Sequence, residues 1–76
     1  MNKDRREKLR VIAEKISDLK GELEELKDEE QGAFDNMPEG LQQAERGVAM
    51  EAVVEMLDDA MNDMDLVITA LEGAQE

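Results

Sequence analysis

The chain has 76 residues, of which 21 are acidic, nine are basic and none is His, so its formal net charge is −12. This length allows one small domain, taken here as residues 1–76. The absence of Cys excludes a disulfide framework, and the absence of both Cys and His removes the usual zinc and iron–sulfur ligands. No His can activate the single Ser17 or Thr69, so we expect a protein that is not an enzyme, with no catalytic residue, metal or cofactor.

The first predicted element is a long helix over about residues 3–33. Its apolar side chains alternate at intervals of three and four residues: Leu9, Ile12, Ile16, Leu19, Leu23 and Leu26. This heptad spacing places all six on one stripe of an α-helix, with Leu9 at position a and Ile12 at position d. The stripe weakens after Leu26, and Gly32 favours a helix end close by.

Residues 34–42 are predicted to form the turn. Asn36 stands shortly before Pro38, a pattern typical of a chain reversal that is followed by a helix start. We expect Asn36 or Met37 to cap a short helical piece over residues 38–43. The side chains expected to fill the bend are Phe34, Met37 and Leu41.

The second long helix is predicted over about residues 43–72, where Gly47 is expected to allow a change of direction and Gly73 to mark the end. Its seam, again spaced by three and four residues, consists of Met50, Val53, Leu57, Ala60, Met64, Val67 and Leu71. A second apolar stripe lies beside this seam at intervals of seven residues: Val54, Met61 and Ile68. The apolar face is therefore wider than a two-stranded seam uses.

One short connection makes the two predicted helices antiparallel neighbours, so the expected fold is all-α, an antiparallel helical hairpin. A single hairpin would leave the second stripe of the second helix in water. Burying three side chains of this size is worth roughly 5–9 kcal/mol before ordering costs, and chains this small often need oligomerisation to be stable. We therefore expect a homodimer that forms a four-helix bundle, while a trimer or larger assembly stays open. The expected oligomer interface is Val53, Val54, Leu57, Met61, Met64, Ile68 and Leu71.

Charge is unevenly distributed along the sequence. Residues 1–27 hold eight basic and seven acidic side chains, a net charge of +1, whereas residues 28–76 hold one basic and fourteen acidic side chains, a net charge of −13. The candidate partner-binding face is formed by acids of the second helix: Glu51, Glu55, Asp58, Asp59, Asp63 and Asp65. Such a surface repels nucleic acid, so we expect no direct nucleic acid binding and a basic protein surface as partner. It is interpreted either as an imitation of phosphates or as a solvated face that keeps a small bundle soluble.

The N-terminal ten residues are basic, and charged residues interrupt the apolar positions that follow, so we expect no membrane contact and a cytoplasmic location. These basic residues are expected either to pair with Glu72 and Glu76 at the end of the second helix or to contact phosphate. The Met side chains of the second helix are interpreted as core filler, with Met56 the most exposed of them.

Five carboxylates resemble the EExxE…ExxD pattern of all-α nucleotide pyrophosphohydrolases, which bind magnesium through carboxylates on helices. They are Glu24, Glu25, Asp28, Glu55 and Asp58. In the predicted heptad the first three point away from the second helix, so they do not converge with the other two. We therefore expect no metal site in this chain.

The turn and the residues on either side of it have the sequence EEQGAFDNMPEGLQQAERG over residues 29–47. It resembles a group of small phage and prophage proteins that share the turn pattern EEQxxFDNxPExLQxxExG and an LxxA-type second helix. The resemblance spans about residues 16–72, implies a helical hairpin of mobile-element origin in the host cytoplasm, and carries over no catalytic residue. Many small acidic phage proteins bind and inhibit host or defence proteins, so it favours a non-enzymatic inhibitor of this kind. Two alternatives stay open: a structural coiled-coil scaffold, and an oligomeric nucleotide sponge that uses Arg46 and the basic N-terminus.

Overall fold

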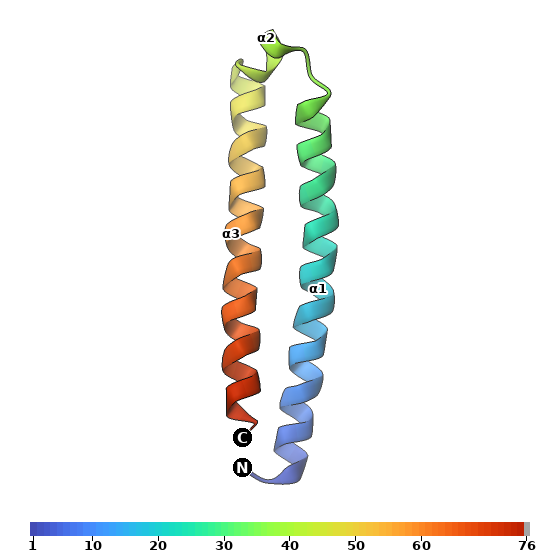
Figure 1. Cartoon of the computed structure of the whole chain (residues 1–76), viewed down its shortest axis with the longest axis vertical. Coiled ribbons are helices and arrows are strands. Elements are labelled where there is room, and N and C mark those ends of the chain that lie inside the picture. The colour runs from blue at the N-terminus through green and yellow to red at the C-terminus, as the bar shows by residue number, and fades with distance from the viewer. Residues whose placement is uncertain (76) are drawn as a thin grey trace.

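The structure is a computed structural model that describes residues 1–75 and contains only helices and turns in that range. The helices are α1 (Lys3–Asp35), α2 (Glu39–Gln42) and α3 (Glu45–Ala74). Figure 1 shows the two long helices side by side, running in opposite directions, with α2 at one end and both termini at the other. The Cα trace extends 58 × 15 × 11 Å. The prediction of an all-α chain with long helices is confirmed.

Helix α1 begins with a side-chain cap and continues past its predicted end. The Oδ1 of Asn2 accepts a hydrogen bond from the backbone N–H of Arg5 at 2.8 Å, which satisfies one of the free donors of the first turn. The helix ends at Asp35 rather than near residue 33. Gly32 does not stop it, because no Gly of the described residues adopts the positive φ of a glycine C-cap.

The connection between the long helices differs in detail from its prediction. The N-cap of α2 is Pro38, which offers no side-chain hydrogen bond, whereas Asn36 is the C-cap of α1. The expectation that Asn36 or Met37 would cap the next helix is therefore wrong. The residue before Pro is disfavoured in the helical conformation, which explains why α1 ends short of Pro38. Leu41, expected to fill the bend, is 54% exposed, while Phe34 and Met37 are half-buried.

The first turns of α3 pack closely against α2. The Nε2 of Gln42 donates a hydrogen bond to the backbone carbonyl of Phe34 at 3.0 Å, which ties α2 to the end of α1. Gly47 is buried within α3, and a Cβ atom built on it would collide with the backbone of Gln42. Gly47 thus permits a close approach of two backbones rather than a change of direction. At the far end, α3 passes through Gly73 and ends at Ala74.

The side of α1 that faces α3 is not the predicted seam. It combines the predicted a positions with the e positions next to them, and its less exposed members are Leu9, Ala13, Ile16, Lys20, Leu23 and Lys27. The predicted d positions lie outside the contact, since Ile12, Leu19 and Leu26 are 46%, 53% and 54% exposed.

Helix α3 shows the same change of register. The side chains turned toward α1, all buried or half-buried, are Met50, Val54, Leu57, Met61, Met64, Ile68 and Leu71. The expectation that Val54, Met61 and Ile68 would be left in water is therefore wrong, and Met61 is one of the most buried side chains described, at 8% exposure. The stripe left in water contains Val53 and Val67 instead, at 42% and 47% exposure.

Two lysines explain this register. Lys20 and Lys27 occupy e positions that look polar in the sequence, yet their side chains are only 29% and 27% exposed. Each lays its aliphatic stem along the contact between α1 and α3 and holds its ammonium group at the rim, against a carboxylate of α3.

Among the described residues, no helix has an apolar stretch that would cross a lipid bilayer.

Candidate functional site

Two ion pairs join the long helices along one side of the molecule. The Nζ of Lys20 lies 2.6 Å from Asp65 Oδ1, and the Nζ of Lys27 lies 3.0 Å from Asp58 Oδ1. The hydrogen bond from Lys27 to Asp58, followed by the charge of that carboxylate, raises the pKa of the Lys27 ammonium. We call this side, marked by Lys20, Lys27, Asp58 and Asp65, the ion-pair flank.

The predicted acidic face of α3 is exposed but divides into two parts. Asp58 and Asp65 belong to the ion-pair flank, where they hold α3 against α1. The remaining four take part in no ion pair among residues 1–75: Glu51, Glu55, Asp59 and Asp63. Because Glu51, Glu55 and Asp59 follow each other at intervals of four residues, they are neighbours on one side of the helix and repel one another. They contribute nothing to holding α3 against α1.

Folding concentrates the negative charge in one half of the rod. The ion pair between Lys20 and Asp65 shows that these residues lie at the same height, so residues 20–65 form the half next to α2. This half holds fifteen acidic and three basic side chains, a net charge of −12. The described residues of the other half, 1–19 and 66–75, hold six basic and five acidic side chains. The rod therefore has an acidic half and a nearly neutral half.

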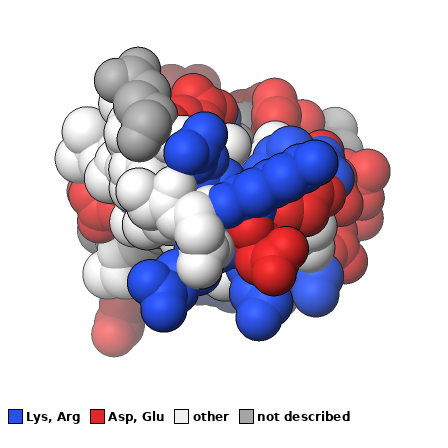
Figure 2. All heavy atoms as spheres, turned by 90° about the horizontal axis from the view of Figure 1, so that it is seen from below, with Lys and Arg blue, Asp and Glu red and all other residues white. Residues whose placement is uncertain are grey.

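The basic residues of α1 gather at the end where both termini lie. Figure 2 shows this end with Lys and Arg side chains at its surface next to acidic ones. The described ion pairs here run within α1, from Arg10 to Glu7 and to Glu14, rather than to α3. The hydrogen bond from Arg10 lowers the pKa of Glu7. The expected pairing of the basic residues with Glu72 is therefore wrong, because no ion pair among residues 1–75 involves Glu72. Glu76 lies outside the described residues.

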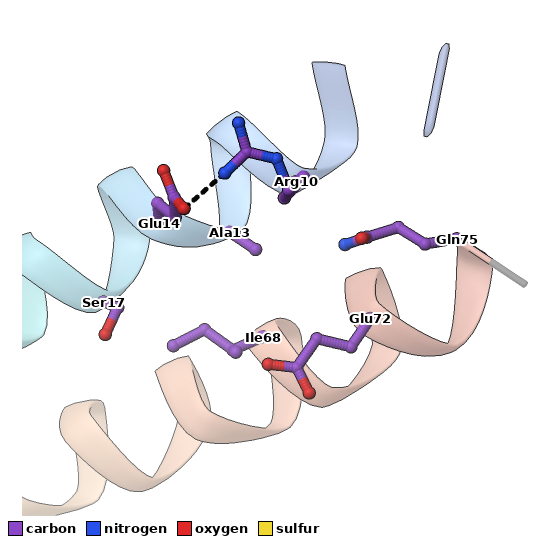
Figure 3. A pocket seen from close by; sticks show the side chains of 7 residues that line it. All are labelled: Arg10, Ala13, Glu14, Ser17, Ile68, Glu72 and Gln75. Carbon is purple, nitrogen blue, oxygen red and sulfur yellow. Dashed lines mark hydrogen bonds and ion pairs between the residues drawn. The ribbon is translucent and has the colours of Figure 1, made fainter. Parts of the chain in front are cut away.

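A shallow groove of about 360 Å³ opens between α1 and α3 near this end (Figure 3). Its lining residues are Arg10, Ala13, Glu14, Ser17, Ile68, Glu72 and Gln75. The Arg10 guanidinium is turned to Glu14, and the carboxylate of Glu72 lies on the opposite wall. Carboxylates on both walls make the groove unfavourable for a phosphate group. Arg46, near the start of α3, lies at the other end of the rod, so one chain does not combine it with the basic N-terminus.

The carboxylates that resembled a magnesium-binding pattern do not assemble. Glu24, Glu25 and Asp28 are exposed on α1, while Asp58 is bound by Lys27. Within residues 1–75, no three Asp or Glu side chains come close enough together to hold a metal ion.

The side of the rod opposite the ion-pair flank is apolar, and sequence reasoning missed it. Leu19 and Lys20 are adjacent in the chain and so about 100° apart around α1, which places them on opposite sides of the contact with α3. Asp65 and Val67 are separated in the same way on α3. In the view of Figure 1 the two long helices lie side by side, so one of these two sides faces the viewer and the other faces away. We call this side the apolar flank; its large side chains, all exposed by 42% or more, are Ile12, Leu19, Leu26, Val53, Met56 and Val67.

Comparison of the chain with protein-family models, with curated proteins and with solved structures finds no match.

Proposed function

We propose that this chain is a non-enzymatic interaction protein, a dimeric helical hairpin whose acidic half binds a basic surface on another protein. The observation that carries the proposal is the uneven charge of the rod, in which residues 20–65 hold the net charge of −12. Glu51, Glu55 and Asp59 support it, because they repel one another on the exposed side of α3 without pairing to α1. The resemblance of the turn to phage and prophage proteins makes a host or defence protein the expected partner.

The density of charge supports phosphate mimicry as the mode of binding. Half of a rod 58 Å long carries twelve net negative charges, which is roughly one per 2.4 Å, against one per ~1.7 Å of axis on duplex DNA. A protein surface that binds DNA through Lys and Arg would therefore meet a similar field on this half of the rod. In this function the chain occupies the site of the nucleic acid and inhibits the partner by exclusion.

The test is affinity capture from the natural host followed by mass spectrometry, with two charge-neutralised baits. Glu55→Gln with Asp59→Asn removes two charges from the acidic half, and Asp18→Asn with Glu72→Gln removes the same number and types from the other half. We expect the first bait, but not the second, to lose the captured protein.

The captured protein is then titrated with the purified chain at increasing salt. Screening shortens the Debye length from about 14 Å at 50 mM to about 4 Å at 500 mM, so a charge-driven complex weakens strongly over that range. Phosphate mimicry further requires that duplex DNA compete for the same site. An affinity that does not change with salt, or equal loss with both baits, would refute the proposed function.

A further inference from the structure

We infer that a second copy of this chain covers the apolar flank, related to the first by a two-fold axis perpendicular to the helices. In this arrangement α1 packs on the partner's α1 in the opposite direction, and the two turns lie at opposite ends of the bundle. The inference rests on the self-association included in the proposed function, and it gives that association a surface and a symmetry.

The apolar flank has the size and the composition of a dimer interface. The rod measures 58 by 15 Å in the plane of the two helices, so one flank offers roughly 800–900 Å² per copy, and stable interfaces bury about 800 Å² per partner. Isolated exposed apolar residues are common, but here six large ones share one side of two helices. Between the large side chains of α3 on this flank stand only small or uncharged residues and Asp63.

The rim of this flank on α1 is complementary to itself. The g positions of the heptad, which border the exposed d positions, are Lys8, Lys15, Glu22 and Glu29. All four are exposed, and none forms an ion pair within residues 1–75. When two α1 helices lie antiparallel with their centres together, Lys8 stands opposite the partner's Glu29 and Lys15 opposite the partner's Glu22. The two pairs share the same centre, midway between residues 18 and 19.

The apolar side chains have nearly the same centre, half a residue further along α1. Leu19 is the middle residue of α1 (Lys3–Asp35), and Ile12 and Leu26 stand seven residues to either side of it. The axis therefore brings Leu19 onto the partner's Leu19 and Ile12 onto the partner's Leu26. On α3, Val67 lies at nearly the height of Leu19, because Asp65 is paired with Lys20, so Val67 also lies at the axis. Val53 and Met56 lie closer to α2 and extend past the end of the partner's α3, so the second copy covers the flank along α1 and around Val67.

The charge of the whole rod favours this symmetry over the other two-fold arrangement. An axis parallel to the helices would also join the two apolar flanks, but it would place both acidic halves side by side, with twice the net charge of −12 at one end. It would also bring Glu22 to the height of the partner's Asp63. The perpendicular axis instead lays the acidic half of each copy along the nearly neutral half of the other.

The first test is sedimentation equilibrium of matched variants between about 1 and 100 µM. Leu19→Asp places two like charges in the centre of the buried surface, and we expect at least about a 100-fold weaker dimer. Leu66→Asp is the matched control, since Leu66 is 70% exposed on the outer side of α3, and we expect less than a twofold effect. Circular dichroism of both variants checks that α1 and α3 remain helical.

The second test separates the two symmetries by charge reversal on the rim. With the perpendicular axis, Lys15→Glu and Glu22→Lys each weaken the dimer about three- to tenfold, and the double variant restores it. With the parallel axis, Glu22→Lys alone would strengthen the dimer because it meets the partner's Asp63. That result would overturn the inferred symmetry, and a stronger effect of Leu66→Asp than of Leu19→Asp would overturn the inferred surface. A parent chain that stays monomeric at 100 µM would overturn the dimer, while binding to a basic protein surface would stand or fall separately in the salt titration.

Discussion

Replacing Gly by Ala inside a helix ordinarily stabilises a protein, but at Gly47 we expect the replacement to destabilise it. Gly47 lies in the first turns of α3 with an ordinary negative φ, so its conformation itself suits Ala. The obstacle is the backbone of Gln42, which occupies the space that a Cβ atom would need. Backbone atoms cannot rotate away as a side chain can, so α2 must move and the hydrogen bond from Gln42 to Phe34 is strained or lost.

The magnitude follows from two opposing contributions. Gly→Ala within a helix contributes about 0.8–1.0 kcal/mol of stability. Overpacking against a fixed neighbour costs about 1–3 kcal/mol, and the lost hydrogen bond costs about 1 kcal/mol more. We therefore expect Gly47→Ala to lower the free energy of unfolding by about 1–3 kcal/mol. For a chain of this size that corresponds to a fall in Tm of roughly 4–24 °C.

Gly21→Ala is the matched control, because Gly21 lies within α1 with nothing within 4 Å of an added Cβ atom. It should raise the stability by about 0.8–1.0 kcal/mol. Both variants and the parent are melted at one protein concentration, followed by circular dichroism, since self-association makes Tm depend on concentration. A Gly47→Ala variant as stable as the parent would refute the close approach of α2 to α3.

Four further outcomes are expected. Met61→Ala, at one of the most buried positions of α3, should cost about 2–3 kcal/mol in a urea titration, whereas Leu66→Ala should cost less than about 0.5 kcal/mol. Asn2→Ala removes the cap of α1 and should cost about 1 kcal/mol, with Asn2→Asp close to neutral in the same melt. The raised pKa of Lys27 means that its pairing stabilises the fold below its ordinary pKa of ~10.4 and is lost as the pH rises through the higher folded value. The parent should therefore lose more Tm between pH 9 and pH 12 than a Lys27→Met variant, and an equal loss would contradict the pairing. Leu19→Cys should form an intermolecular disulfide under mild oxidation because the two-fold axis passes beside it, while Leu66→Cys should not, and the absence of native cysteines makes the result unambiguous.

The periodicity of the sequence predicts the long helices because spacings of three and four residues persist along both, and Pro38 predicts the break between them. It does not decide which stripe of each helix faces the other. On α3 the a, d and e positions are all apolar, so Val53 and Val54 were equally suited to the contact. On α1 the e positions include Lys20 and Lys27, which a hydrophobicity pattern assigns to water although their stems cover the contact.

The apolar flank could not be recognised until that register was known. When α1 and α3 contact each other through their a and e positions, Leu19 and Val67 remain exposed on the same side of the rod. The charged residues from Lys8 to Glu29 then border this exposed apolar side. The sequence predicts the acidic residues of α3, but it does not predict which of them pair with lysines of α1. Only the ion pairs of Lys20 with Asp65 and of Lys27 with Asp58 separate the carboxylates that hold the helices together from those that take part in no ion pair among residues 1–75. The need for Gly at position 47 likewise follows only from the position of α2, whose Gln42 backbone occupies the space of a Cβ atom.

Both termini emerge side by side at the end of the rod away from the turn. A fluorophore, a purification handle or a surface tether can therefore be attached at either terminus and projects from the same tip. A single chain immobilised through a terminus would point its turn away from the support, so that a protein in solution meets the carboxylate-rich half first.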